Sequence, residues 1–382
     1  MTFQEYRFRN VASLINGRAY LMPELQDSGK YKIVRVGNFT GKDEWFFSDM
    51  ELEPEKYCEN GDLLYKWACT FGPEIWKGDK TIYHYHIWKV LCNPVLLDKT
   101  YFFYYLKYYT PLWLSGTNGA TMVHITKASM EKKKLYLPTL PQQQKIASIL
   151  SAYDSQIEIN QKRIKLLEQM AENLYKEWFV RFRFPGYETA EFEGGVPKGW
   201  VSLVGDNKKP KGWTYGELNQ LGTFIRGKNI TAAEMIEGQV PVISAGLEPA
   251  GYHNQANVCG PCLTISSSGA NAGYLKYNLT DIWAADCSYY NNPDNIWFVY
   301  SSLKYLQPVI SNLQCGAAQP HVYPKDVNRL CVILPPKSLI TEYNRQSSLF
   351  FKNIHNLKNQ IFLLTHQRDL LLPRLMSGKL SI

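Results

Sequence analysis

Long apolar runs, a targeting signal and nucleotide-binding motifs are all absent from this sequence. A helix needs about eighteen consecutive apolar residues to cross a membrane. The aromatic stretch from Tyr101 to Leu114 comes nearest, but Lys107 and Pro111 interrupt it. The first residues, Met-Thr-Phe-Gln-Glu-Tyr-Arg, lack the hydrophobic core of a signal peptide. We therefore expect a cytoplasmic protein that does not span a membrane.

Catalytic signatures are also missing. The chain has no GxxxxGK[ST] loop, no GxGxxG after a strand, no HExxH and no GxSxG. Asn291-Asn-Pro-Asp294 is similar to the Asn-Pro-Pro-aromatic signature of amino-methyltransferases, but the second proline and the aromatic residue are lacking. Glu131-Lys-Lys133 matches the end of a nuclease motif, yet its place before a strand-like run favours surface charge. We predict a chain that catalyses nothing by itself and binds no cofactor.

The eight cysteines do not form a pattern typical of a metal site. Cys259-Gly-Pro-Cys262 has the spacing of a redox motif, but such chemistry needs the first cysteine at a helix N-terminus. A strand-like Leu-Thr-Ile-Ser follows instead, and no second pair lies at zinc-ligand spacing. His84-Tyr-His86 would place two imidazoles on one face of a strand; without a third ligand nearby, an aromatic-rich sheet face is favoured.

What the sequence has in plenty is apolar and aromatic residues. Of its 382 residues, 45% are apolar and 14% aromatic, which is ample for packed cores in two or three domains. The net charge of +8 permits a polyanionic partner without requiring one.

One long helix is predicted over residues 142–178. Its apolar residues recur every third or fourth position, the pattern of a left-handed coiled coil, and no proline interrupts it between Pro141 and Pro185. Such a helix is about 55 Å long. Asn160 is the single polar residue in the seam; it either fixes the register of the helices or makes a plain buried hydrogen bond. The predicted seam residues are Ile146, Leu150, Ile157, Asn160, Ile164, Leu167 and Leu174.

A second helix repeats this seam 197 positions later, with Phe350, Ile354, Leu357, Ile361, Leu364 and Leu371 as its seam residues. The repeat begins before the helix. At the same offset, Leu106-Lys-Tyr recurs as Leu303-Lys-Tyr, Gly119-Ala as Gly316-Ala, His124 as His321, and Leu137-Pro as Leu334-Pro. One constant offset over about seventy residues predicts a tandem duplication.

Looser matches extend the duplication toward the N-terminus of each copy. Residues 11–18 are similar to residues 221–228. In the same way, residues 31–39 are similar to 240–246, and residues 61–65 are similar to 260–265. These are strand-like runs that end or turn on glycine. Short helices are expected over 99–109 and 300–313.

We therefore predict an α+β fold with an internal pseudo-two-fold repeat, in which two mixed α/β units are joined by two long antiparallel helices that form a coiled coil. The segments are a first unit over 1–140, a helix over 141–180, a linker rich in glycine and proline over 181–212, a second unit over 213–336 and a helix over 337–378.

This layout resembles the specificity subunit of type I restriction-modification systems over essentially the whole chain. The resemblance is carried by Tyr31-Lys-Ile-Val-Arg-Val-Gly-Asn, Gly251-Tyr-His-Asn, Trp283-Ala-Ala-Asp286, Leu137-Pro-Thr-Leu-Pro-Gln-Gln-Gln-Lys-Ile and Arg368-Asp-Leu-Leu-Leu-Pro-Arg-Leu-Met-Ser-Gly-Lys-Leu. It implies that 1–140 and 213–336 are target recognition domains, each reading one half of a bipartite double-stranded DNA sequence. The helices would set the gap between the halves.

The resemblance also implies partners. Two modification (methyltransferase) subunits would dock on the helices, and restriction/translocase subunits would join them. The chain would be non-catalytic, whereas the assembled complex would be an adenine DNA methyltransferase and ATP-dependent endonuclease.

Candidate DNA contacts follow from residue type. Lys and Arg suit phosphates, and Arg or Ser on loops can reach base edges. The candidates are Arg18, Arg35, Lys66 and Lys77 in the first copy, and Arg226, Lys228, Ser267, Ser268 and Lys276 in the second. Each alone is also consistent with a solvated surface residue.

Two other functions remain open from the sequence. A coiled-coil adaptor that binds peptide or carbohydrate would show salt-insensitive binding and no affinity for duplex DNA. A self-sufficient modification enzyme would bind S-adenosylmethionine as an isolated chain.

Overall fold

The computed structural model describes residues 2–41, 44–115, 125–196, 208–314 and 320–382. Several predicted repeat matches, among them Gly119-Ala, His124 and Gly316-Ala, lie outside these residues, as does the middle of the predicted linker. By packing, the chain divides into two compact units. Unit 1 comprises Met1–Ile159 and Ile361–Ile382, and unit 2 comprises Asn160–Gln360. Each unit therefore includes part of both long helices, whereas the predicted segmentation treated the helices as separate parts.

The two long helices begin and end where local sequence signals place them. Helix α4 runs from Leu140 to Tyr175 and continues as a π-helical turn over Lys176–Val180, and α9 runs from Lys337 to Met376. Before α4, the backbone N–H of Thr139 donates to the side chain of Gln142, which satisfies one donor at the helix start. After α9, Gly378 adopts a positive φ of 73°, a conformation that ends helices and favours glycine.

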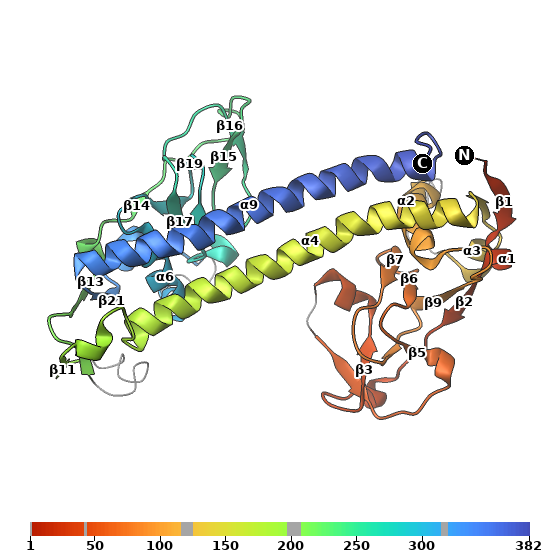
Figure 1. Cartoon of the computed structure of the whole chain (residues 1–382), viewed down its shortest axis with the longest axis horizontal. Helices are drawn as coiled ribbons and strands as arrows, with labels where there is room; N and C mark the ends of the chain where they lie inside the picture. Colours follow the sequence, from red (N-terminus) through yellow and green to blue (C-terminus); the bar gives the residue numbers. More distant parts are fainter. Residues whose placement is uncertain (1, 42–43, 116–124, 197–207, 315–319) are drawn as a thin grey trace. The chain divides into compact units, whose positions relative to one another are not determined.

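The described residues of unit 1 form three sheets, and Figure 1 labels several of their strands. Strand β1 (Gln4–Arg7) pairs with β10 (Lys134–Leu137). An antiparallel sheet has the order β2 (Ala12–Asn16), β9 (Ile87–Cys92), β6 (Leu63–Lys66), β7 (Gly72–Ile75). The third sheet has the order β4 (Phe46–Ser48), β3 (Tyr31–Val34), β8 (Thr81–Tyr83), β5 (Tyr57–Cys58), and β3 and β8 are parallel. Its helices are α1 (Phe8–Val11), α2 (Lys99–Ser115) and α3 (Lys127–Glu131).

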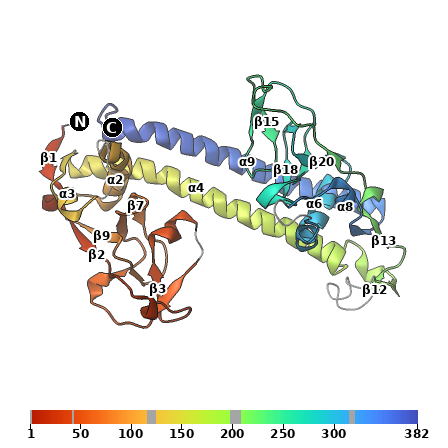
Figure 2. The same cartoon turned by 180° about the vertical axis from the view of Figure 1, so that it is seen from behind.

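Unit 2 repeats this plan (Figure 2). Strand β13 (Thr214–Glu217) pairs with β21 (Cys331–Leu334). The second sheet has the order β14 (Ile225–Arg226), β20 (Cys287–Tyr290), β17 (Cys262–Ser266), β18 (Leu275–Asn278). The third has the order β16 (Gly251–His253), β15 (Val240–Ile243), β19 (Trp283–Ala284), with β15 and β19 parallel. Its helices are α6 (Ile296–Tyr305), α7 (Gln307–Ser311) and α8 (Pro324–Asn328). Strands β11 (Phe192–Gly194) and β12 (Lys208–Pro210) pair within the predicted linker.

The shared strand order shows that the duplication reaches the region where the two sequences have diverged. Gly17 and Gly227 illustrate the match. A Cβ atom at Gly17 would lie 2.3 Å from the Tyr83 carbonyl oxygen, and one at Gly227 would lie 2.5 Å from that of Ala284. Only glycine allows the chain after β2 and β14 to pass this close to the strand end, so both copies keep it.

The short helices differ in part from the prediction. Helix α2 continues through Pro111 to Ser115, and α6 begins at Ile296, four residues before the expected start. Helix α6 ends at Tyr305, and α7 begins at Gln307 with Pro308 in its first turn, where the missing N–H costs least. Proline alone does not explain this break, since Pro111 lies at the same repeat position inside the continuous α2.

The predicted seam residues all lie inward. None of the thirteen is exposed, and Ile146, Leu150 and Ile354 are fully buried. In unit 1, Ile146 and Leu150 of α4 share a core with Leu375 of α9. In unit 2, the fully buried Asn160 donates from Nδ2 to Gln360 Oε1 at 3.2 Å, so its polar group is satisfied across the helix pair.

Among the described residues, no helix is both long and apolar enough to cross a membrane.

Candidate nucleic-acid interface

Matching main-chain hydrogen bonds place one loop site in each unit. The Trp67 N–H donates to the His86 carbonyl oxygen at 3.2 Å, and the Ser267 N–H donates to that of Asp286 at 3.3 Å. Strand register adds a third pair. Asn16 lies opposite Trp88, two residues after His86, and Arg226 lies opposite Ser288, two residues after Asp286. Positions 16 and 226, 67 and 267, and 86 and 286 therefore correspond. Loop site 1 denotes Asn16, Arg18, Trp67, His84, Tyr85 and His86; loop site 2 denotes Arg226, Lys228, Ser267, Ser268 and Asp286.

Loop site 1 is aromatic. The Trp67 ring stacks on Trp88 with centroids 5.6 Å apart and stands nearly perpendicular to His86 at 5.3 Å. Its Nε1 donates to the Tyr85 carbonyl oxygen at 2.8 Å. Tyr85 remains 37% exposed, so part of this cluster is available to a ligand. The histidines lie in the turn between β8 and β9 rather than along a strand.

His84 adds no charge to loop site 1 at neutral pH. Burial, together with smaller contributions in the same direction from His86 and Arg35, lowers the pKa of this imidazole to about 4. The site therefore offers neutral π faces, which suit stacking more than phosphate attraction.

Loop site 2 is polar and charged. Asp286 accepts hydrogen bonds from the Arg226 guanidinium at Oδ1 and from the Ser268 hydroxyl at Oδ2. Beside this carboxylate lies a recess of about 440 Å³, lined in part by Asn229, Thr231 and His321. The recess is walled by hydrogen-bonding groups, so it can receive a polar edge.

The candidate contacts of unit 1 have unequal access to a ligand. Arg35 is exposed, with its guanidinium 5.1 Å from the Phe46 ring. Arg18 gives both terminal nitrogens to Glu24, at 3.0 and 2.7 Å. Lys77 is exposed and paired with Glu158. Lys66 is only 7% exposed and pairs with Glu74 at 2.6 Å, a placement that favours a structural role over a DNA contact.

Three candidates of unit 2 converge around Asp286, namely Arg226, Ser267 and Ser268. Ser267 is 1% exposed, and its hydroxyl has no hydrogen-bond partner within the described residues. Lys228 is exposed two residues beyond Arg226. Lys276 is not part of this group, since its Nζ donates to the Leu247 carbonyl oxygen and its side chain lines another cavity.

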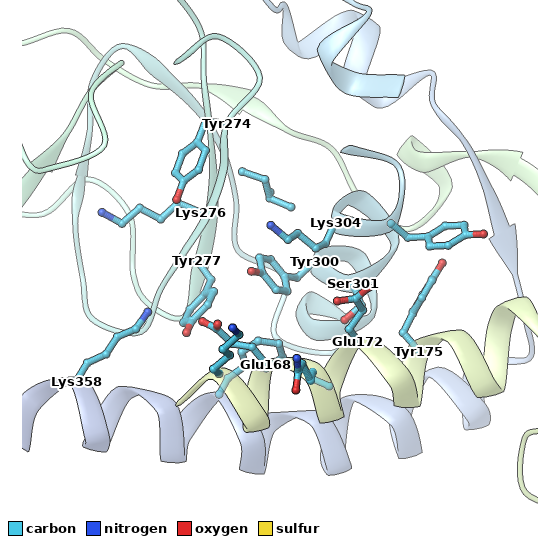
Figure 3. A pocket seen from close by; sticks show the side chains of 16 residues that line it. Glu168, Glu172, Tyr175, Tyr274, Lys276, Tyr277, Tyr300, Ser301, Lys304 and Lys358 are labelled. Atoms are coloured by element: carbon cyan, nitrogen blue, oxygen red, sulfur yellow. The ribbon is translucent and has the colours of Figure 1, made fainter. Parts of the chain in front are cut away.

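That second cavity, also about 440 Å³, lies within unit 2 between α4, α6, α9 and β18 (Figure 3). Four lysines, two glutamates and several tyrosines line it. At the repeat offset, its residues Ser301, Phe351 and Ala171 correspond to Tyr104, Asp154 and Arg368 of unit 1. In unit 1 these three side chains bond to one another, with Tyr104 donating to Asp154 at 2.5 Å and Arg368 paired to the same carboxylate. The cavity thus lies where unit 2 has a serine and an alanine in place of the larger tyrosine and arginine.

Two residues of the loop sites, Asp286 and Trp67, have no local sequence signal. Asp286 belongs to the Trp283-Ala-Ala-Asp segment, and Trp67 was not among the predicted contacts. Their roles depend on strand pairing between distant segments. Within the described residues, no three potential ligands gather as a metal site. Burial raises the pKa of the Cys262 thiol to about 12, which keeps it protonated and unreactive.

Known proteins provide an independent comparison. The sequence profile described as "Type I restriction modification DNA specificity domain" matches residues 1–169 and 210–368. The type I restriction enzyme MjaIX specificity subunit of Methanocaldococcus jannaschii is 26% identical over 307 residues, which cover 76% of this chain and 70% of that protein. The type I restriction enzyme HindI specificity subunit of Haemophilus influenzae is 26% identical, covering 70% and 73%.

A solved structure shows the same fold. The S subunit of a type I restriction-modification system from M. genitalium superposes with a TM-score of 0.68 at 18% identity, covering 98% of this chain and 96% of that one. The profile matches twice, once in each copy of the repeat, and together the two matches span most of the chain. The predicted α+β fold with an internal repeat is confirmed, and the chain belongs to the family of type I restriction-modification specificity subunits.

Proposed function

We propose that this chain is the sequence-specific DNA-binding subunit of a type I restriction-modification complex, and that each unit reads one half of a bipartite target. Residues 1–140 and 213–336 would be the two target recognition domains, connected through the linker at 181–212. The helices over 141–180 and 337–378 would set the spacing and dock two methyltransferase subunits. The restriction/translocase subunits would join that assembly, which would supply adenine methylation and ATP-dependent cleavage. The chain itself would contribute recognition and no catalysis.

The observation that carries this proposal is the pair of loop sites. They share backbone hydrogen bonds and strand order but differ at all three corresponding side-chain positions: Asn16 against Arg226, Trp67 against Ser267, and His86 against Asp286. A dimer of identical chains presents two identical readers and binds a palindrome. Two diverged readers on one chain suit an asymmetric target, in which each half has its own sequence.

Charge supports a polyanionic partner. The chain carries a net +8, and exposed cations such as Arg35 and Lys228 lie in or close to the loop sites. Contacts between such cations and phosphates release counterions, so binding should weaken steeply as salt increases.

Exposed apolar residues along the helices support docking of a protein partner. On α4, Ile159, Leu166 and Met170 are 49–59% exposed at intervals of seven and four residues. On α9, Leu349, Leu363 and Leu370 are 51–55% exposed at multiples of seven. These intervals place each set along one helix face, and exposed apolar stripes on helices are typical of protein interfaces.

The test is methylome sequencing of cells that express the chain with its modification subunits, compared with cells that lack only this chain. We expect an adenine-methylated bipartite motif with a fixed gap in the first cells and none in the second. Identical methylation in both would contradict the proposal. In that case, salt-insensitive binding to peptide or carbohydrate would favour the adaptor function.

A further inference from the structure

We propose that Arg226 reads a guanine in the half-site of unit 2, with Asp286 and Ser268 as positioning residues. This inference rests on the proposed function, because it assigns a base to a DNA-reading unit. It concerns loop site 2 alone and makes no claim about the half read by unit 1.

Arg226 is held in place by a carboxylate that is itself fixed. One terminal nitrogen, Nη2, donates to Asp286 Oδ1, and the other oxygen of that carboxylate is occupied by the Ser268 hydroxyl. The main chain of Asp286 is fixed in turn by the Ser267 N–H. A carboxylate bonded on both oxygens restrains the guanidinium and lowers the entropy lost when Arg226 binds a second partner.

Arg226 keeps hydrogen-bond donors available for a further partner. Its side chain is 43% exposed, and the hydrogen bond to Asp286 uses one of the donors of a planar fork. The remaining N–H groups can meet two acceptors side by side. Guanine offers such a pair in the major groove, O6 and N7.

The charge around Arg226 favours a base over a phosphate as its partner. The carboxylate of Asp286 offsets the charge of Arg226 and would repel a phosphate brought to the same guanidinium. The acceptors of guanine carry no formal charge and meet no such repulsion. Lys228, two residues along, is also exposed and forms no direct ion pair in the described part of the chain; its charge acts on Glu234 only at longer range. It therefore suits a phosphate better than Arg226 does.

Unit 1 shows that the arrangement is particular to unit 2. The position of Arg226 is taken there by Asn16, and that of Asp286 by His86. The nearby Arg18 has both terminal nitrogens bonded to Glu24, so its fork is already occupied. Loop site 1 therefore lacks a restrained arginine with free donors.

The recess beside Asp286 provides space for the neighbouring base pair. Asn229, Thr231 and Glu234 line it with hydrogen-bonding groups, and His321 closes it through backbone pairing with Ser268. A base edge that enters next to Arg226 would thus meet further donors and acceptors.

The first experiment is methylome sequencing with the wild-type complex and with Arg226→Ala and Arg226→Lys. We expect one guanine position in one half of the motif to relax to several bases in both variants, because lysine keeps the charge but not the fork. The other half should be unchanged. Lys228→Ala is the matched control: it should reduce methylation at all sites without changing the motif.

Asp286→Asn tests the positioning role. It should weaken the guanine preference while making binding to unrelated duplexes tighter and more salt-dependent, because the repelling carboxylate is gone. A carboxylate with a merely structural role would lower stability without changing the salt dependence of binding.

A second measurement remains informative if the Arg226 variants do not fold. The wild-type complex is titrated with a target duplex in which each guanine of the motif is replaced in turn by 7-deazaguanine, which lacks the N7 acceptor. We expect one position of the unit 2 half-site to weaken binding about ten-fold.

Several outcomes would overturn the inference while leaving the proposed function intact: a unit 2 half-site without guanine, a motif unchanged by Arg226→Ala, or no loss with 7-deazaguanine. A methylome that does not depend on the chain at all would instead refute the proposed function.

Discussion

The two loop sites are built on the same backbone but are held together by different forces. In unit 1, Trp67 is fixed by stacking on Trp88 and by its contact with His86. In unit 2, the equivalent Ser267 offers no ring, and the site is held by the hydrogen bonds of Asp286. The frame depends on main-chain hydrogen bonds that any side chain permits, so the side chains are free to diverge. This freedom is what two readers of unlike DNA sequences require.

The same contrast recurs inside each unit, where the long helices pack against a short helix. Unit 1 has the polar group Tyr104, Asp154 and Arg368, whereas unit 2 packs Phe351 against Trp297 at a centroid distance of 4.2 Å. In unit 1 the polar group lies between the helix pair and a short helix, whereas in unit 2 part of the corresponding space stays open as the cavity of about 440 Å³. We expect substitutions in the two units to lower the free energy of unfolding by different amounts.

The largest effect is expected from Phe351→Ala. Phe351 is 2% exposed and lies parallel to Trp297, so its removal leaves a cavity beside a ring that has lost its partner. We expect a loss of about 3–5 kcal/mol in the free energy of unfolding, measured by denaturant titration. Leu349→Ala, at a residue 55% exposed, is the control and should change it by less than about 0.5 kcal/mol. Equal effects of the two variants would contradict the packing described.

The counterpart in unit 1 is Asp154→Ala. It removes the partner of the Arg368 side chain, which is 14% exposed, and the acceptor of the Tyr104 hydroxyl. We expect a loss of about 2 kcal/mol, less than for a fully buried pair because Asp154 is itself partly solvated. Asp369→Ala, which removes the more exposed partner of Arg368, should cost less than about 1 kcal/mol in the same titration. A larger loss for Asp369→Ala would show that Asp154 is not the main partner.

An exchange of side chains between the loop sites tests recognition directly. The double variant Trp67→Ser and His86→Asp gives loop site 1 the side chains of loop site 2 at two corresponding positions. Because stacking on the DNA bases would be lost, we expect the unit 1 half of the motif to relax by about 1–3 kcal/mol per affected base. Methylome sequencing should show the unit 2 half unchanged. Relaxation of both halves would mean that the units do not read independently.

Acid should affect unit 1 through His84. Its pKa of about 4 in the folded chain lies below the ordinary value near 6.5, so the unfolded chain binds the extra proton first. The contribution of His84 is therefore complete above about pH 6.5 and is lost as the pH falls toward 4. His84→Gln should flatten this part of the profile of Tm against pH. An unchanged slope would assign the acid sensitivity to other groups; His366→Gln, at an exposed histidine of α9, serves as the control.

The smallest effect concerns the helix seam. At the repeat offset, Asn160 of α4 corresponds to the apolar Leu357 of α9. Asn160→Leu removes a buried amide and leaves the exposed Gln360 to water, so we expect stability to rise by about 1 kcal/mol. Thermal unfolding measures this. A decrease would indicate that the Asn160–Gln360 hydrogen bond is a net stabilising contact rather than a device for register.

The sequence predicted the long helices and the duplication because both depend on local periodicity and on a constant offset. The seam from Ile146 to Leu371 lies inward as that periodicity implies. The loop sites could not be predicted in the same way. Asn16, Trp67 and His86 are brought together by pairing among β2, β6 and β9, which no local pattern reveals.

Lys66 shows the same limit for a predicted contact that the structure does not favour. A cation at the start of a loop suits a phosphate, but Lys66 is the last residue of β6 and its side chain lies inward against Glu74. Ser267 likewise begins a serine-rich loop yet is buried. Which way a side chain points at a strand end depends on register, and the register of these strands is set by partners far along the chain.

The most direct test of two independent readers is a chain in which residues 8–137 and 218–334 are exchanged and the long helices are kept. Expressed with the modification subunits, this variant should methylate a motif with the same two half-sites in exchanged order. An unchanged order, with methylation still dependent on the chain, would show that the units do not carry the half-site specificity and would contradict the account.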